Sequence, residues 1–202
     1  LDEKLLPTDL PFESDNRHLE DRELQSVAIN GDLAVLGIPL HQTHGAVYVF
    51  QRGSQGWQQI QRLQPASPSS ALIGDWFGYS LALSQGRLAV GAFYDSTQST
   101  WAGAVYTYEW NGNQFVSDEK LFSPDPQPRA NFGFDVDLDR GSLVAGAPIH
   151  PNGSSSLQGR VHVFERNATA WRVVQSFSPG EGDRFGESVA IHGNRVAAGF
   201  PK

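Results

Sequence analysis

The feature that most constrains the fold is an internal repeat of about 54 residues. A short alternating segment opens with Phe77-Gly78, and the same pattern returns at Phe132-Gly133 and Phe185-Gly186. A degenerate copy that lacks both Phe and Gly begins at Glu23. A period this long predicts that the chain is built from similar supersecondary units that pack against their neighbours.

Two further landmarks keep register with the first and divide each unit into four short segments, which we call strands A to D. The second landmark is Gly37-Ile38-Pro39, Gly91-Ala92-Phe93, Gly146-Ala147-Pro148 and Gly199-Phe200-Pro201, and the third begins at Gly45, Gly103 and Gly159. The segments alternate apolar and polar residues, as half-buried strands do. Four antiparallel strands per unit at this period predict an all-β fold of β-propeller blades.

The landmarks set the expected domain boundaries. Complete blades are predicted at 23–64, 77–123 and 132–178, a partial blade at 185–202, and a lone strand D at 1–9, where Leu1–Leu6 mirrors Ser117–Phe122. Together these form a single propeller domain or a propeller fragment. A blade split between the two ends would lack strand C. The sequence therefore leaves three options open: a fragment, closure through another chain, or an unusually small ring.

The three landmarks resemble FG-GAP repeats, the blades of the integrin α-subunit N-terminal propeller and of many exported microbial proteins. The resemblance implies a secreted or cell-surface protein, or a periplasmic one, that works in adhesion or ligand binding. Calcium-binding members of that family carry an Asp-rich loop between strands A and B. In this chain that connection is a short hairpin, so we expect no cofactor; Asp135, Asp137 and Asp139, which imitate the calcium spacing, remain the alternative metal ligands.

Composition narrows the class of partner. The chain has 15 Lys and Arg against 22 Asp and Glu, a net charge of −7, which argues against nucleic acid and against an anionic membrane surface. No apolar run approaches the roughly 18 residues that a membrane span needs. The chain has no Cys, which excludes disulfides and thiolate chemistry. Glycosylation sequons begin at Asn152 and Asn167, and their use is left open.

Loop lengths point to one face of the blades. The A–B and C–D connections are short and constant, whereas the D–A and B–C connections vary, and variable loops on a rigid scaffold usually carry the binding residues. We therefore expect a protein or glycan ligand on the face formed by these variable connections, the D–A/B–C face. The candidate contacts are His41, His44, Trp76, Tyr94, Asp95, Trp101, His150 and Asn152. Further blades, from the same longer chain or another copy, are the alternative partners.

Catalytic motifs are absent from the sequence, so we expect a non-catalytic module. Three alternatives stay open: a lectin-like propeller that stacks sugars on Trp76, Tyr94 and Trp101; a structural part of a larger propeller or extracellular assembly; and a carboxylate-based hydrolase at the propeller centre. His41 and His44 could hold a transition metal, but no third ligand lies nearby in the sequence. An Asp stands just before the first landmark in three copies, at Asp21, Asp75 and Asp183, and this recurrence predicts that Asp75 caps the turn into strand A.

Overall fold

A computed structural model describes residues 5–8, 24–41, 43–69, 74–151, 158–179 and 184–199, and within these ranges every regular element is a β-strand. The first sheet contains β1 (Ser26–Asn30), β2 (Leu33–Ile38), β3 (Ala46–Gly53) and β4 (Gly56–Leu63). The second contains β5 (Ser80–Ser84), β6 (Arg87–Ala92), β7 (Ala104–Trp110) and β8 (Phe115–Leu121). The third contains β9 (Val136–Asp139), β10 (Ser142–Ala147), β11 (Arg160–Arg166) and β12 (Trp171–Phe177), and a final hairpin contains β13 (Ser188–His192) and β14 (Arg195–Gly199).

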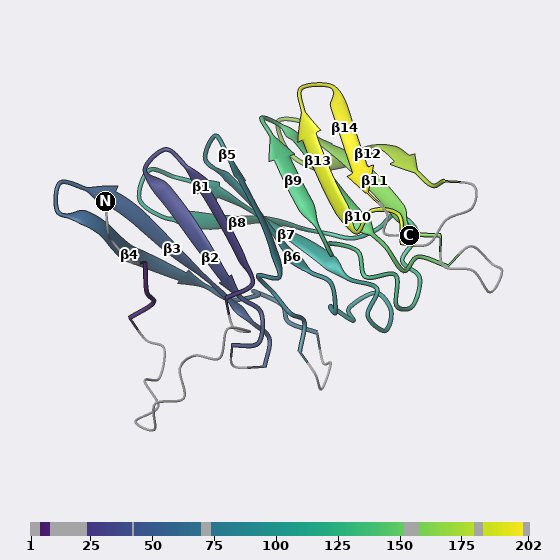
Figure 1. Ribbon diagram of the computed structural model, residues 1–202, viewed down its shortest axis with the longest axis horizontal. Coiled ribbons are helices and arrows are strands. Elements are labelled where there is room, and N and C mark those ends of the chain that lie inside the picture. The colour runs from purple at the N-terminus through teal and green to yellow at the C-terminus, as the bar shows by residue number, and fades with distance from the viewer. Residues whose placement is uncertain are drawn as a thin grey trace.

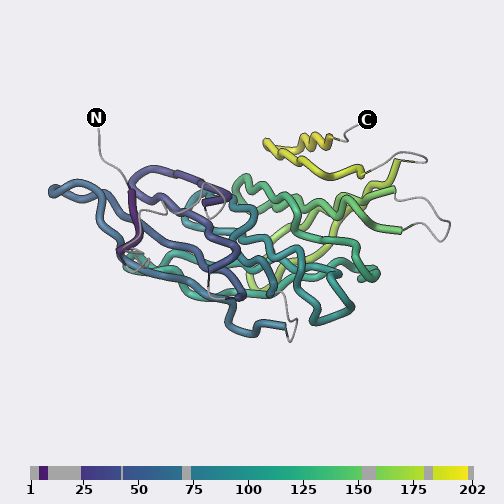
Figure 2. The backbone as a smooth tube through the Cα atoms, turned by 60° about the horizontal axis from the view of Figure 1, so that its bottom comes forward, coloured from purple at the N-terminus to yellow at the C-terminus, as the bar shows by residue number. Residues whose placement is uncertain are grey.

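Each sheet is an antiparallel meander whose strands lie in chain order, as in a propeller blade. The first strands of successive sheets, β1, β5, β9 and β13, contact one another in that order. The sheets therefore stand side by side, with the first sheet and the β13–β14 hairpin at opposite ends of the row (Figure 1). The hairpin of β13 and β14 lies beside the third sheet (Figure 2). The predicted fold is thus confirmed: an all-β row of three complete blades followed by an incomplete one.

The Phe-Gly and Gly-x-Pro landmarks are where neighbouring blades touch. A Cβ built on Gly37 would lie 2.0 Å from the carbonyl oxygen of Gly78 in the next blade, and one on Gly91 would lie 2.1 Å from that of Gly133. Gly78 itself has a φ of +93°, which side-chain-bearing residues rarely adopt. Ser26 Oγ donates a hydrogen bond of 2.6 Å to the same Gly78 oxygen. Backbone packs directly on backbone here, which explains why the repeat needs glycine in both positions.

The core lies between the sheets. Phe77 and Phe132 of the Phe-Gly landmarks are completely buried, each inserted between its own blade and the one before it. Val35 of β2 shares the first interface with Phe77, and Leu121 of β8 shares the second with Phe132. Since each blade buries its apolar face only against a neighbour, the stability of one blade depends on the next.

The described part of the N-terminal segment, Leu5–Thr8, is not a strand, but it packs where a strand D would. Leu5 packs against a cluster that includes Leu36 and Tyr48 on the outer face of the first sheet. Leu63 of β4 and Leu121 of β8 take the corresponding positions in the next two interfaces. The Thr8 backbone N–H donates to Gln59 Oε1 of β4 at 2.8 Å. The remainder of the predicted strand at 1–9 falls outside the described residues. No described helix is long and apolar enough to cross a membrane.

Candidate functional site: an aromatic cluster on the D–A/B–C face

Three of the predicted contact residues meet on the D–A/B–C face of the second blade. Trp76 precedes β5 in the D–A connection, while Tyr94 and Trp101 lie in the B–C connection between β6 and β7. The ring centroids of Trp76 and Tyr94 are 5.1 Å apart, and those of Tyr94 and Trp101 are 5.3 Å apart. All three side chains are half-buried, so each is held by its neighbours and still reaches solvent.

Phe93 forms the floor beneath these rings. It is 4% exposed, and its ring centroid lies 5.3 Å from that of Trp76, 4.3 Å from Tyr94 and 4.4 Å from Tyr79. Phe134 of the third blade closes the set at 5.2 Å from Phe93. We call these six residues, Trp76, Tyr79, Phe93, Tyr94, Trp101 and Phe134, the aromatic cluster. The cluster spans the second and third blades, so its rings stay in place only while those blades remain packed together.

Three of the six rings, those of Tyr79, Phe93 and Phe134, are not among the contact residues predicted from the sequence. Phe93 occupies the position that Pro39 and Pro148 take in the neighbouring blades, and this departure from the Gly-x-Pro landmark supplies the floor. Tyr79 and Phe134 each follow a Phe-Gly directly. At the third position of the Gly-x-Pro landmark, the second blade therefore has a cluster ring where its neighbours have proline.

The backbone holds both tryptophans in an unusual conformation. Trp76 has a φ of 57° and Trp101 a φ of 53°, in the left-handed region that costs about 1–2 kcal/mol for most residues. Asn131 and Arg184, the residues before the next two Phe-Gly pairs, have φ values of 59° and 62°. The repeat therefore imposes this conformation at position 76, and Asn would suit it better than Trp does. Placing Trp there fixes a large ring at the loop face at some cost in stability.

Arg129 adds a cation beside the cluster. Its side chain is exposed, its guanidinium carbon lies 5.2 Å from the Trp101 ring centroid, and its backbone N–H donates to Thr100 O at 2.7 Å. Within the part of the chain that the structure describes, no carboxylate forms an ion pair with it. By contrast, Arg184 pairs with Glu187 at 2.9 Å.

Tyr79 of the cluster has a raised pKa. Burial, reinforced by the Glu187 charge, raises the pKa of Tyr79 above its usual value.

Asp95, also a predicted contact residue, belongs to the scaffold instead. Its side chain is fully buried and lies 2.8 Å from Lys120 Nζ. Tyr106 donates its hydroxyl to Asp95 Oδ2 at 3.1 Å, and the Thr97 backbone N–H donates to Oδ1 at 2.9 Å. Burial and the Asp95 carboxylate hold the pKa of Tyr106 far above its ordinary value. The carboxylate is saturated by these donors and anchors the B–C connection.

His41 and His150 occupy the same place as Asp95 in their own blades. In all three the backbone N–H closes a turn on the residue three positions earlier, and the carbonyl accepts from the glycine that begins the third landmark. His150 is 2% exposed, with Nδ1 2.8 Å from Pro151 O and Nε2 3.1 Å from Asp125 O. His41 packs edge-on against Tyr48. These two histidines therefore anchor loops as Asp95 does.

His44 faces Asp75 rather than His41. His44 Nδ1 lies 3.3 Å from Asp75 Oδ2, and the buried Asp75 carboxylate also accepts from the Ser69 backbone N–H at 2.9 Å and from the Ser69 hydroxyl. These contacts fit the turn-capping role predicted for Asp75. No group of three His, Cys, Asp or Glu residues suited to a metal ion occurs among the described residues. Asn152 lies outside the described residues.

The Asp135, Asp137 and Asp139 carboxylates bind backbone instead of forming a loop around a cation. Their Oδ2 atoms accept hydrogen bonds of 2.7, 2.8 and 2.6 Å from the N–H groups of Val189, Ile191 and Gly193 respectively. The three aspartates thus cap the free edge of β13 and join the third blade to the final hairpin. Burial raises the pKa of Asp135, while the bonds from backbone N–H groups oppose that rise.

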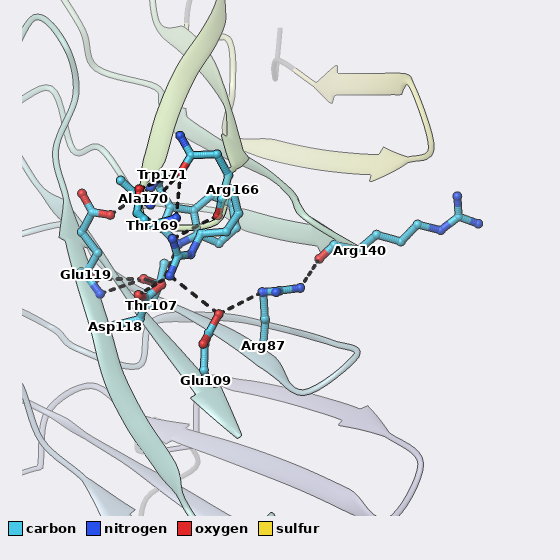
Figure 3. A network of polar contacts seen from close by, with 11 residues as sticks. Arg87, Thr107, Glu109, Asp118, Glu119, Arg140, Arg166, Thr169, Ala170 and Trp171 are labelled. Atoms are coloured by element: carbon cyan, nitrogen blue, oxygen red, sulfur yellow. Dashed lines mark hydrogen bonds and ion pairs between the residues drawn. The ribbon is translucent and has the colours of Figure 1, made fainter. Parts of the chain in front are cut away.

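A second group of carboxylates lies between the second and third blades (Figure 3). Asp118 Oδ1 lies 2.8 Å from Arg166 Nη2, and Asp118 Oδ2 accepts from the Trp171 indole N–H at 3.0 Å. Glu119 accepts from the Trp171 backbone N–H at 3.0 Å, and Glu109 lies between Arg87 and Arg166. Asp118 and Glu119 of β8 thus accept hydrogen bonds from Arg166 and Trp171 of the third blade, and these contacts hold the two sheets together.

A family model of known proteins agrees with this architecture. The family model for the FG-GAP repeat matches residues 57–108, a stretch that runs from β4 of the first blade through β7 of the second. The chain therefore contains an FG-GAP repeat, and the matched stretch holds Trp76, Phe93, Tyr94 and Trp101 of the cluster. The comparison with curated proteins finds no match.

Two solved structures illustrate how distant the structural likenesses are. A europium-containing methanol dehydrogenase aligns with a TM-score of 0.48 and 11% identity, over 77% of this chain and 24% of that one. The N-terminal domain of Nup159 aligns with a TM-score of 0.35 and 9% identity, over 75% of this chain and 47% of that one. The chain thus spans less than half the length of either protein. Neither likeness bears on function at these scores.

Proposed function

We propose that this chain is a non-catalytic binding module that holds a protein or glycan ligand on its D–A/B–C face, with the aromatic cluster as the contact surface. The observation that carries the proposal is the chain of half-exposed rings Trp76, Tyr94 and Trp101 above the buried Phe93. Trp, Tyr and Arg are the residue types that dominate binding energy at protein surfaces. A secreted or cell-surface setting, which the FG-GAP repeat suggests, belongs to the same proposal.

Two physical features favour binding over catalysis at this face. The rings are pre-ordered by packing and by backbone conformation, so little side-chain entropy is lost when a ligand binds. Asp75 and Asp95, which lie in the same two connections as the cluster tryptophans, are fully buried and engaged with scaffold donors. Neither is placed to exchange protons with a ligand on the surface.

A combined glycan and peptide array tests the proposal. We expect the wild-type protein to bind at least one class of ligand, and the double variant Trp76→Ala/Trp101→Ala to lose at least about tenfold in affinity, since hot-spot rings are worth 2 kcal/mol or more. Trp110→Ala is the matched control, because Trp110 is a half-buried tryptophan at the end of β7, beside the C–D turn. Binding that survives the double variant, or no binding on either array, would contradict the proposal.

A further inference from the structure

We infer that the aromatic cluster and Arg129 together bind a carbohydrate that carries one carboxylate, such as an oligosaccharide ending in a uronic acid. This inference rests on the proposed function and names the ligand class for the same site. It combines two features that lie side by side: rings that offer apolar faces, and a guanidinium with no carboxylate partner among the described residues.

The rings suit a sugar because they form a faceted surface. The planes of Trp76 and Tyr94 meet at 75° and those of Tyr94 and Trp101 at 41°. Adjacent rings therefore face different directions, and each offers a contact about the size of one ring. A pyranose presents C–H groups on its face and hydroxyls around its edge, which match an aromatic face bordered by polar atoms.

Arg129 supplies the selective element. A guanidinium binds a carboxylate through two parallel N–H···O bonds, which are stronger than bonds between neutral groups. Arg160 and Arg184, which flank the same face, are already paired with Asp125 and Glu187, each at 2.9 Å. Arg129 differs from both because no described carboxylate pairs with it, while Trp101 supports one side of its side chain. Its donors are therefore available to a ligand.

The charge of the chain limits the ligand to one or few carboxylates. The net charge of −7 repels a polyanion at long range. On the D–A/B–C face, however, three acidic groups are each paired with a cation: Asp125 with Arg160, Asp95 with Lys120 and Glu187 with Arg184. Arg129 is then a cation without a described carboxylate partner on a chain of negative net charge, which fits a single acidic sugar at the end of an otherwise neutral glycan.

The test uses a panel of disaccharides that end in a uronic acid, each paired with its methyl ester, titrated calorimetrically into the full chain. The ester keeps the sugar ring and removes the charge. We expect at least one acid to bind about tenfold or more tightly than its ester, since a hydrogen bond to a charged group is worth about 1.5–3 kcal/mol. Arg129→Gln should abolish that preference while leaving ester binding unchanged, and Trp101→Ala should weaken both.

Arg140→Gln is the charge control. Arg140 is exposed, has a φ of 57° like Arg129 with its 62°, and lies in the β9–β10 hairpin. It should retain the preference for the acid. Equal affinity for acid and ester, or a preference that survives Arg129→Gln, would overturn the acidic-sugar inference and leave the binding site standing. So would a panel that fails entirely while an array peptide binds in a Trp76- and Trp101-dependent way. Failure of both panel and arrays would overturn the proposed function as well.

Discussion

The second and third blades share one framework and differ at the positions that reach the loop face. Tyr106 of the second blade and His162 of the third occupy equivalent places, and their cross-strand partners are Lys120 and Ser176. The second blade therefore builds a buried ion pair of Asp95 with Lys120, whereas the third builds a neutral network in which His162 bonds to Ser176 and Ser123. The same framework therefore accommodates an ion pair in one blade and a neutral hydrogen-bond network in the next at these equivalent positions.

The two blades differ again at the landmark proline. Phe93 of the second blade stands where the third has Pro148, and Trp76 stands where the third has Asn131. In both cases the third blade has the residue that suits the backbone, and the second has an aromatic ring that joins the cluster. The aromatic face is therefore an addition to the repeat and is not required by it. Exchanging residues between the blades tests that statement.

The largest effect is expected from removing the cation of the buried ion pair. Lys120→Ala leaves the Asp95 carboxylate buried with no opposing charge, which should lower the free energy of unfolding by about 3–5 kcal/mol. The equivalent change in the third blade, Ser176→Ala, removes only neutral bonding to His162 and should cost about 1 kcal/mol. Urea unfolding of both variants makes the comparison, and similar losses would mean that the two anchors are energetically alike.

Replacing the floor of the cluster by the proline of the third blade should have the next largest effect. Phe93→Pro removes a buried ring, which typically costs about 3–5 kcal/mol, but the backbone accepts proline at this position in both neighbours. We expect a net loss of about 2–3 kcal/mol with the blade intact. Tryptophan fluorescence should shift to longer wavelength as Trp76 loses its packing. An unchanged spectrum would show that Phe93 does not hold the rings.

Acid should weaken the third blade more than the second. Burial, with help from His150 and Arg160, lowers the pKa of His162 from 6.5 to about 4. Between those values the unfolded chain binds more protons than the folded one, so this contribution is complete above pH 6.5 and is lost as the pH falls towards 4. From pH 7 to pH 5 the loss should be about 2 kcal/mol.

The variant His162→Tyr, which restores the residue of the first two blades, isolates that contribution. It should lose about 2 kcal/mol less than the wild type over the same pH interval, measured by urea unfolding at each pH. Asp135 acts in the opposite direction in both proteins, because a raised carboxyl pKa favours the folded state as the pH falls. Parallel pH profiles for the two proteins would show that His162 titrates normally.

The smallest change in stability is expected at Trp76. Trp76→Asn installs the residue of the third blade, so relief of the left-handed backbone offsets the lost ring contacts, and the net change should stay within about 1 kcal/mol. Ligand affinity should nevertheless fall about tenfold or more. Thermal unfolding and array binding of the same preparation separate the two quantities. A large loss of stability would mean that Trp76 serves the fold.

Much of this architecture could be predicted because the repeat records contacts that recur. Phe77-Gly78 packs against the preceding blade and Gly91 packs against the following one, and both contacts return in each blade at the spacing of the sequence repeat. The sequence also predicts that the variable D–A and B–C connections share one face, because these connections lie at the same end of the sheets. Trp76, Tyr94 and Trp101 were identified in this way.

What the sequence could not separate was side-chain direction within those loops. Asp95, His41 and His150 lie on the predicted face but turn inwards, and only their common position four residues after a landmark glycine marks them as anchors. Phe93 points the other way, into the cluster. The Asp135 series shows the same limit, because alternation placed these carboxylates on one side of the strand without revealing the β13 backbone they bind. Loop turns and inter-blade edges decide these directions, and neither follows a simple period.

The central claim, that ligand binds at the aromatic cluster of the second blade, is tested most directly by the five tryptophan indole N–H signals in a nitrogen-labelled sample. Trp76 and Trp101 lie in the cluster, whereas Trp57, Trp110 and Trp171 lie on β4, β7 and β12. On titration with the strongest array ligand, we expect the signals of Trp76 and Trp101 to shift while the other three stay in place. Shifts confined to Trp57, Trp110 or Trp171 would contradict it.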